Sequence, residues 1–268
     1  YAGPLQAVIF DWAGTTVDYG SCAPVAVFVE VFRRRGVTVT PQQARAPMGL
    51  EKKDHIRAVA AQPAMAEQWR VLQGRDWAEA DIEALYRDSV PLQAECVADY
   101  ADLIPGTQVT VAACRARGLK IGSSTGYSRS IMDALLPAAA QRGYAPDAVV
   151  CPSDVPAGRP APWMIFQNAA QLGVYPMAAL VKVGDTLPDI EEGLNAGTWT
   201  IGLSRSGNEL GLPEHEAAAL DSRLLAEKLM QIEHRLRQAG AHYVVETIAD
   251  VPPILDAIEA RLRQGERP

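Results

Sequence analysis

The sequence predicts an α/β protein in which a parallel sheet, covered by helices, carries an inserted all-helical domain. Short apolar runs alternate with amphipathic segments over most of the chain, which is typical of a parallel sheet with helices on both faces. The interval 21–103 breaks this alternation, because it holds several helical patterns and no convincing strand. With 268 residues, the chain is long enough for one large domain or for a medium domain that carries a smaller one.

Six short apolar runs predict the strands of the sheet. They lie at residues 5–10, 119–123, 148–151, 180–183, 198–203 and 242–245. Buried strands of parallel sheets have this length and composition. Helical patterns occur at residues 128–140, 162–172, 217–238 and 253–262. Together these elements predict a Rossmann-like core domain formed by residues 1–20 and 104–268. The polar stretch 204–216 has no predicted role beyond a loop over the site or simple surface.

The segment 21–103 is predicted to be a helical cap domain. Apolar side chains recur from Val25 to Phe32 at the spacing of one helix face. Residues 56–61 and 78–96 show the same kind of pattern. Since the segment follows the first predicted strand directly, we expect the cap to be inserted after that strand.

The chain carries a formal net charge of −7, from 25 Lys and Arg against 32 Asp and Glu. This balance gives no reason to expect nucleic acid or an anionic membrane as a partner, although a metal and a few local cations can still hold a small anion. No apolar stretch approaches the roughly 18 to 20 residues that span a bilayer, and the N-terminus lacks a signal-peptide pattern. The four cysteines form no C-x-x-C pair. We expect a cytoplasmic protein with reduced thiols that acts on a small molecule.

Three polar residues follow predicted strands at the sheet edge where ligands of parallel sheets bind. Asp11 follows the first strand, Thr125 follows the run at 119–123, and Asp185 follows the run at 180–183. Each residue alone is also common in turns and helix caps. Their matching positions in three loops favour one shared site.

These residues belong to four ordered motifs that resemble those of the haloacid dehalogenase superfamily. The motifs are Asp11-Trp12-Ala13-Gly14-Thr15-Thr16, Ser124-Thr125-Gly126, Arg159 and Gly184-Asp185-Thr186-Leu187-Pro188-Asp189. Members of this superfamily mostly transfer phosphoryl groups through an aspartate nucleophile. The resemblance implies that Asp11 is the nucleophile and that Thr125 and Arg159 bind the phosphoryl group. It also implies Mg²⁺ as cofactor, held by Asp11, Asp185, Asp189 and the backbone carbonyl of Ala13.

Two of these assignments have structural alternatives. Asp189 precedes an acidic helical segment and could instead cap that helix. Arg159 lies in a predicted loop and could be a solvated surface residue. Because Mg²⁺ keeps several waters and needs only one or two carboxylates, Asp11 and Asp185 satisfy it with or without Asp189.

The position two residues after Asp11 departs from the pattern of phosphatases in this superfamily. Those enzymes usually have a second aspartate there, which serves as general acid for the leaving oxygen. Here the residue is Ala13. An ordinary phosphate monoester would therefore leave without its proton donor, which predicts either a defective phosphatase or a leaving group other than oxygen.

A second clue is Lys52 in the predicted cap. If the segment from Glu51 is helical, Lys52 shares an apolar face with His55 and Ile56, whereas Lys53 points to solvent. On spacing alone, two adjacent lysines are more often solvated surface, and His55 could be a structural histidine. A buried Lys52 would be free to act as a nucleophilic amine.

Ala13 and Lys52 together make the chain resemble the phosphonoacetaldehyde hydrolase family. The tracts that carry this resemblance are 11–20, Lys52-Lys53-Asp54-His55, Val155-Pro156-Ala157-Gly158-Arg159-Pro160 and Gly173-Val174-Tyr175-Pro176-Met177. The resemblance implies hydrolysis of a carbon–phosphorus bond in 2-aminoethylphosphonate degradation, through a Schiff base on Lys52 and an aspartyl phosphate on Asp11. We expect His55 to move protons during Schiff-base formation. A homodimer through the cap domain is also implied, with apolar surface from Phe28 to Phe32.

Three alternative functions remain open at this point. A phosphatase or phosphomutase of the same superfamily would use magnesium but not Lys52, and it lacks an acid at Ala13. A Schiff-base lyase would use Lys52 and leave the four ordered motifs without a function. A non-catalytic protein that binds phosphate-like anions would need neither Lys52 nor Asp11.

Overall fold

The computed structural model describes residues 1–268 and contains one six-stranded parallel sheet. The strands are β1 (Ala7–Phe10), β2 (Lys120–Ser124), β3 (Ala148–Val150), β4 (Leu180–Gly184), β5 (Trp199–Leu203) and β6 (Tyr243–Val245). Their order across the sheet is β3-β2-β1-β4-β5-β6, and every neighbouring pair is parallel. The predicted fold class is confirmed.

Seven helices accompany the sheet. They are α6 (Thr107–Ala116), α7 (Arg129–Gln141), α8 (Trp163–Leu172), α9 (Leu187–Ala196), α10 (Glu214–Ala219), α11 (Ser222–Gln238) and α12 (Val251–Arg263), and short 3₁₀ turns lie at Val97–Tyr100, Pro152–Asp154, Met177–Ala179 and Ile248–Asp250. Alternate side chains of each strand face opposite sides, so Val8 and Phe10 pack with α6, α7 and α12, whereas Ala7 and Ile9 pack with α8 and α9. None of the helices combines the length and apolarity that crossing a bilayer requires.

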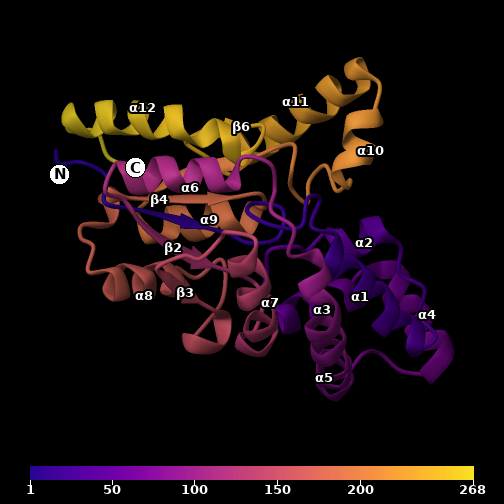
Figure 1. Ribbon diagram of the computed structural model, residues 1–268. Coiled ribbons are helices and arrows are strands. Elements are labelled where there is room, and N and C mark those ends of the chain that lie inside the picture. Colours follow the sequence, from indigo (N-terminus) through magenta and orange to yellow (C-terminus); the bar gives the residue numbers. More distant parts are fainter.

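Five of the six helices between β1 and β2 form a separate body, which we call the cap. They are α1 (Cys22–Arg34), α2 (Pro41–Arg45), α3 (Lys52–Ala60), α4 (Pro63–Gln73) and α5 (Glu79–Cys96). The cap has its own apolar core, and it lies beyond one end of the sheet while both chain termini lie at the opposite end (Figure 1). Phe28 and Phe32, expected to offer surface for a dimer, are instead buried in this core.

Two linkers connect the cap to the core domain: the first runs from the end of β1 to α1, and the second runs from the end of the cap to α6. The two linkers pair with each other. Val17 forms an antiparallel bridge with Leu103, and the Asp18 N–H donates to the carbonyl oxygen of Asp102 at 3.2 Å. The Asp18 carboxylate then accepts from the backbone N–H groups of Cys22 and Ala23, both at 3.0 Å. Because these are unpaired donors of the first turn of α1, Asp18 fixes the start of the cap to the end of the first linker.

The segment expected to be one polar helix over 217–238 consists of two helices. The helix breaks at Leu220 and Asp221, because the Asp221 side chain accepts from the N–H groups of Arg223 and Leu224 and thereby caps α11. The helical patterns found in the sequence did not include α2, α4 or α6. α2 has only five residues, too few for a helical period to be recognised, whereas α4 and α6 are amphipathic helices of 11 and 10 residues.

The capping contact at Asp221 can be tested by unfolding. Asp221→Ala leaves the first N–H groups of α11 without their acceptor, so we expect the free energy of unfolding to fall by about 1 kcal/mol. Urea unfolding followed by circular dichroism measures this loss. Glu227→Ala, which removes an exposed ion pair with Arg223 on the same helix, is the control and should change the free energy of unfolding by less than about 0.5 kcal/mol. Equal losses in both variants would contradict the capping role.

Candidate active site

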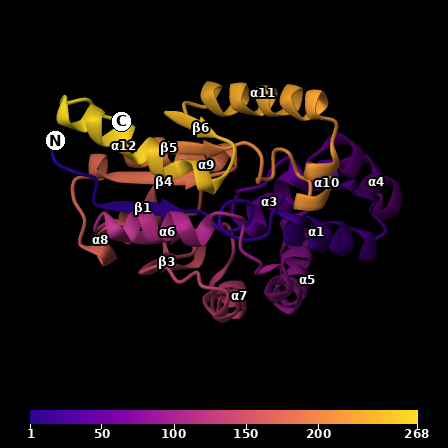
Figure 2. The same cartoon turned by 45° about the horizontal axis from the view of Figure 1, so that its top comes forward.

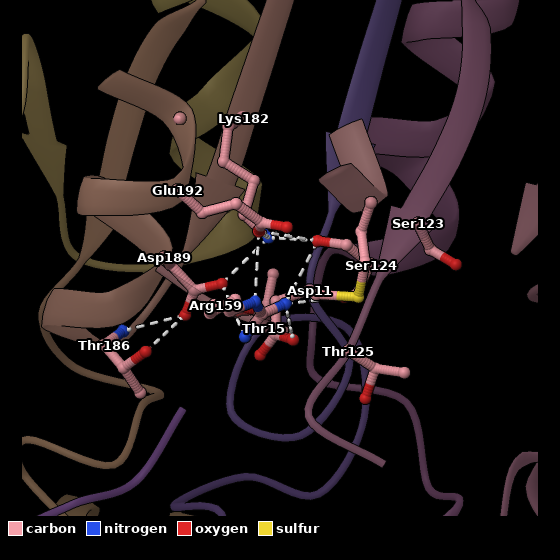
Figure 3. A network of polar contacts seen from close by, with 12 residues as sticks. Asp11, Thr15, Ser123, Ser124, Thr125, Arg159, Lys182, Thr186, Asp189 and Glu192 are labelled. Atoms are coloured by element: carbon pink, nitrogen blue, oxygen red, sulfur yellow. Dashed lines mark hydrogen bonds and ion pairs between the residues drawn. The ribbon is translucent and has the colours of Figure 1, made fainter. Parts of the chain in front are cut away.

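The edge of the sheet where β1, β2 and β4 end gathers the predicted site residues. Because β1 pairs in parallel with both β2 and β4, the loops after these three strands start side by side. These loops carry Asp11, Thr125 and Asp185 (Asp11 and Thr125 are labelled in Figure 3). All three side chains are buried, and one oxygen each of Asp11, Asp185 and Asp189 lie within 4.8 Å of one another.

Arg159 joins Asp11 to two further carboxylates (Figure 3). Its Nη2 donates to Asp11 Oδ1 and to the carbonyl oxygen of Ser124, both at 2.7 Å. Its Nη1 lies 2.9 Å from Asp189 Oδ1, and its Nε donates to Glu192 Oε2 at 3.0 Å. The Arg159 side chain is 1% exposed, so the alternative of a solvated surface arginine is wrong.

Lys182, which the sequence analysis did not single out, completes this buried network. It projects from β4 with no exposed surface, and its Nζ lies 2.8 Å from Asp189 Oδ1 and 3.3 Å from Glu192 Oε2. Nζ also donates to Ser124 Oγ at 2.8 Å. A lysine inside an apolar strand was the available signal, because such a charge requires a buried partner. Glu192 gave a matching signal, since it lies one turn after Asp189 on α9.

The carboxylates of Asp185 and Asp189 differ in how their charge is balanced. Burial alone would raise the pKa of Asp189, but the cations of Arg159 and Lys182 hold that pKa below its ordinary value. Burial raises the pKa of Asp185 well above its ordinary value, and the nearby carboxylates of Asp11 and Asp189 raise it further. Asp185 therefore lacks a counter-charge among the side chains of the protein.

The composition of this cluster fits a divalent cation. Its carboxylates are Asp11, Asp185, Asp189 and Glu192, and its cations are Arg159 and Lys182. With all of these groups ionised, the cluster has two more negative than positive charges. Oxygen ligands from one or two carboxylates are the donor set that Mg²⁺ prefers. A divalent cation beside Asp185 would therefore supply the missing counter-charge.

Asp189 also makes the helix-capping contact that was the alternative to metal binding. The N–H of Thr186 donates to Asp189 Oδ2 at 3.2 Å, and the Thr186 hydroxyl donates to the same oxygen at 2.5 Å. The other oxygen, Oδ1, faces Arg159 and Lys182. Both oxygens of Asp189 are thus engaged by protein groups, and a metal would have to share one of them.

The cap contributes Lys52 to the same site. Lys52 begins α3 and is 4% exposed. Its Nζ lies 4.7 Å from the ring centroid of Tyr127 and 5.5 Å from that of Phe28. Burial lowers the pKa of Lys52 to about 8, and the nearby carboxylate of Asp11 opposes part of this shift.

The cap and the sheet enclose a small pocket. It is lined by Asp11, Ala13, Ser21, Pro24, Met48, Gly49, Lys52, Thr125, Gly126, Tyr127, Arg159 and Thr186. Gly49 has a φ of +94°, and a Cβ there would overlap Thr186 Oγ1. A Cβ at Gly126 would overlap the carbonyl oxygen of Leu50. The cap is therefore closed on the sheet, with an amine and a carboxylate facing one cavity.

His55 lies one turn after Lys52 in the core of the cap. Its ring stacks on Phe28 with the centroids 3.9 Å apart. Its Nε2 lies 2.8 Å from the carbonyl oxygen of Ala44 and so carries the proton, whereas Nδ1 is buried without a partner. Burial lowers the pKa of His55 well below its ordinary value, and the charge of Lys52 acts in the same direction. The histidine is thus neutral and has one unused acceptor.

Lys53 points away from this pocket. Its Nζ lies 3.1 Å from Glu79 Oε1 and pairs with Glu83, and both partners lie on α5. The prediction that Lys52 rather than Lys53 faces the interior is confirmed. Lys53 was expected to contact solvent only, but it forms ion pairs at the surface.

Comparison with known proteins agrees with this site. The family model of the haloacid dehalogenase-like hydrolases matches residues 5–197. The chain is 52% identical over 268 residues to phosphonoacetaldehyde hydrolase of Syntrophobacter fumaroxidans, which covers 100% of this chain and 97% of that protein. It is 46% identical over 255 residues to phosphonoacetaldehyde hydrolase of Bacillus cereus, covering 95% and 97%. A crystal structure of a phosphonoacetaldehyde hydrolase-like protein from Oleispira antarctica superposes with a TM-score of 0.98 at 43% identity, covering 100% and 97%.

These similarities extend over the cap as well as the sheet. The family match alone covers more than half of the chain, and the relatives cover nearly all of it at about half identity. The chain is therefore an enzyme of the haloacid dehalogenase-like hydrolases and belongs, within them, to the phosphonoacetaldehyde hydrolase family.

Proposed function

We propose that this enzyme hydrolyses the carbon–phosphorus bond of phosphonoacetaldehyde to acetaldehyde and phosphate, as a step in the degradation of 2-aminoethylphosphonate. One observation carries the proposal: the buried amine of Lys52 and the carboxylate of Asp11 line the same pocket from opposite sides of the cap boundary. The amine suits the aldehyde end of this substrate, and the carboxylate suits its phosphorus end.

The aldehyde must be converted to an iminium ion because carbon is a poor leaving group. Lys52 condenses with the aldehyde and releases water. Asp11 then attacks phosphorus, the carbon–phosphorus bond breaks, and its electron pair moves onto the carbon framework to give an enamine and an aspartyl phosphate. Water hydrolyses the aspartyl phosphate to phosphate. Protonation of the enamine carbon and hydrolysis of the resulting imine release acetaldehyde and restore the Lys52 amine.

Arg159 and Thr125 are proposed to position the phosphonate. Both line the pocket beside Asp11. Arg159 already donates to Asp11 Oδ1, so its guanidinium holds the nucleophile while it faces the group under attack. Thr125 offers a hydroxyl from the loop that follows β2. Positive charge on the guanidinium reduces the repulsion between the carboxylate and the anionic phosphonate.

His55 is proposed to accept and return protons while Lys52 condenses with the aldehyde. Since its Nε2 proton is held by Ala44, the free Nδ1 is the atom that can take a proton. The lowered pKa of His55 keeps that nitrogen neutral near pH 7. Dehydration of the carbinolamine requires such proton transfers, and His55 follows Lys52 by one turn of α3, although it does not line the pocket itself.

Asp11, Asp185 and the backbone carbonyl of Ala13 are proposed to hold Mg²⁺, and Asp189 remains a predicted ligand beside them. When bound, the ion would neutralise negative charge on the phosphonate and on the developing phosphate. The unbalanced carboxylate of Asp185 is the observation that supports this assignment. We also retain the proposals of a homodimer through the cap and of a cytoplasmic location.

The alternative functions account for fewer of these residues. A phosphatase or phosphomutase would leave the buried Lys52 without a role and would lack an acid at Ala13. A Schiff-base lyase would leave the buried network around Arg159 and Asp11 without a role. A protein that only binds anions would not require an amine with a lowered pKa.

The first test is borohydride trapping with phosphonoacetaldehyde, followed by peptide mapping and a phosphate assay. We expect an adduct on Lys52 in the wild type and at least a 1,000-fold loss of phosphate release in Lys52→Arg, on the order of the effect of losing a covalent nucleophile. Lys53→Arg is the matched control and should behave within about twofold of the wild type. Bond cleavage by Lys52→Arg at the normal rate would exclude the proposed function.

The second test is the pH dependence of Schiff-base formation. The amine must lose its proton before it attacks, so the rate should rise with pH up to about 8 and then level off. At pH 7 roughly one Lys52 in ten is then a free amine, against roughly one in 2,500 for an unperturbed lysine. Initial trapping rates from pH 6 to 10 measure this profile. A midpoint near 10 would show that burial does not activate the amine.

The third test separates the phosphorus end from the amine. Arg159→Lys keeps one positive charge but cannot contact Asp11, Asp189 and Glu192 together, so phosphate release should fall by about 100-fold. Trapping of Lys52 should persist, because the aldehyde end is untouched. Arg129→Lys, a change in an ion pair near the surface, is the control. Equal losses of trapping and of phosphate release would assign Arg159 a general structural role instead.

A further inference from the structure

The polar loop after β5, for which the sequence predicted no role, lies against the first linker to the cap. The N–H of Gly20 donates to the carbonyl oxygen of Ser206 at 2.7 Å. The Ser206 hydroxyl donates to the carbonyl oxygen of Gly14 at 2.9 Å. The loop continues into α10, which lies next to the cap in both views (Figures 1 and 2). A segment of the core domain is thus hydrogen-bonded to the stretch of chain that leads from β1 to the cap.

Arg45 of the cap reaches this loop from the end of α2. Its Nη1 donates to the side-chain Oδ1 of Asn208 at 3.2 Å and to the carbonyl oxygens of Gly20 at 2.6 Å and Ser21 at 3.2 Å. In return, the Asn208 Nδ2 donates to the carbonyl oxygen of Arg45 at 3.3 Å. The Arg45 Nη2 also donates to Cys22 Sγ at 3.8 Å, so the guanidinium contacts carbonyl and amide oxygens and a thiol. We call the two-way contact between Arg45 and Asn208 the clasp.

Asn208 also contacts the catalytic edge of the sheet. Its backbone N–H donates to Asp185 Oδ2 at 2.7 Å. Asn208 is 5% exposed, and its contact with Asp185 is buried, whereas its contacts with Arg45 are partly buried. Asn208 therefore contacts the cap through its side chain and the candidate metal carboxylate through its backbone.

We propose that Arg45 and Asn208 are positioning residues that hold the cap in the closed position, in which Lys52 faces Asp11. This inference rests on the proposed function, because only a reaction that needs both residues requires closure. The clasp joins the cap to the core at a point other than the pocket itself. It also contacts the Gly20 and Ser21 carbonyls, which belong to the linker that must bend when the cap opens.

The backbone and side-chain contacts of Asn208 can be separated by mutation. Asn208→Ala removes the side chain from Arg45 but retains the N–H that Asp185 accepts. Opening the cap slows the condensation of Lys52 with an aldehyde, because the amine loses part of its apolar surroundings, but it does not prevent that step. Cleavage of the carbon–phosphorus bond, in contrast, requires the cap to be closed over Asp11. We therefore expect trapping of Lys52 to persist while phosphate release per trapped Lys52 falls about tenfold, which corresponds to about 1.4 kcal/mol.

Closure is measured directly by hydrogen–deuterium exchange, without reference to activity. The backbone at Gly49 and Leu50 is covered by Thr186 and Gly126 when the cap is closed. In Asn208→Ala we expect exchange of the amides in segment 48–51 to rise about tenfold. Arg45→Met should have the same effect. The effects of the two substitutions should be less than additive in the double variant, because both remove the hydrogen bond from Arg45 Nη1 to Asn208 Oδ1.

Glu209→Gln is the matched control. It lies in the same loop but pairs with Arg235 of α11 at 2.8 Å, within the core domain, so exchange at 48–51 and phosphate release should match the wild type. Wild-type exchange in Asn208→Ala, or additive effects in the double variant, would overturn the clasp. If circular dichroism shows that Asn208→Ala does not fold, the same exchange and phosphate-release measurements on Arg45→Met test the proposal. A wild type that neither traps nor cleaves the substrate would refute the proposed function, while the exchange data would still decide on the clasp.

Discussion

The guanidinium of Arg159 is the contact on which the catalytic edge of the sheet depends. It is buried among the carboxylates of Asp11, from the loop after β1, and of Asp189 and Glu192, from α9. A cation and carboxylates in the interior are costly to desolvate, and removing one partner of such a cluster typically costs about 3–5 kcal/mol. The cluster is therefore stable only as a unit. Burial would lower the pKa of Arg159, but these three carboxylates raise it above its ordinary value, so the charge is permanent.

In the proposed reaction Lys52 has the opposite requirement, because its amine must lose its proton before it can attack an aldehyde. No carboxylate lies within ion-pair distance of its Nζ, and the aromatic rings of Phe28 and Tyr127 are its neighbours. Tyr127 belongs to the core domain, so the apolar surroundings of the amine are complete only when the cap is closed. Closure thus does more than bring Lys52 to Asp11, since it also removes the water that would keep the amine protonated.

The parts of this structure that follow local rules were predictable from the sequence. Residues that are close in the chain determine where strands end and which face of a helix is apolar, and they show this as a periodic pattern in the sequence. The same patterns place Asp11, Thr125 and Asp185 in the loops after strands. Lys182 and Glu192 were missed although a lysine in an apolar strand is a local signal, because its partners lie on another element. The pairing of Arg45 with Asn208, 163 positions apart, leaves no local pattern at all. This contact forms only because the fold brings the end of α2 next to the loop after β5.

The absence of an acid at Ala13 follows from how charge moves in the proposed reaction. An oxygen leaving group departs with negative charge and needs a proton, which an aspartate at this position would donate. An iminium on Lys52 already carries a positive charge, and the electron pair of the broken bond neutralises it without any proton transfer. A second carboxylate beside Asp11 would also add negative charge to a cluster that already has two more carboxylates than cations. Ala13 is therefore consistent with the proposed role of Lys52, because an iminium on that amine makes an acid beside the nucleophile unnecessary.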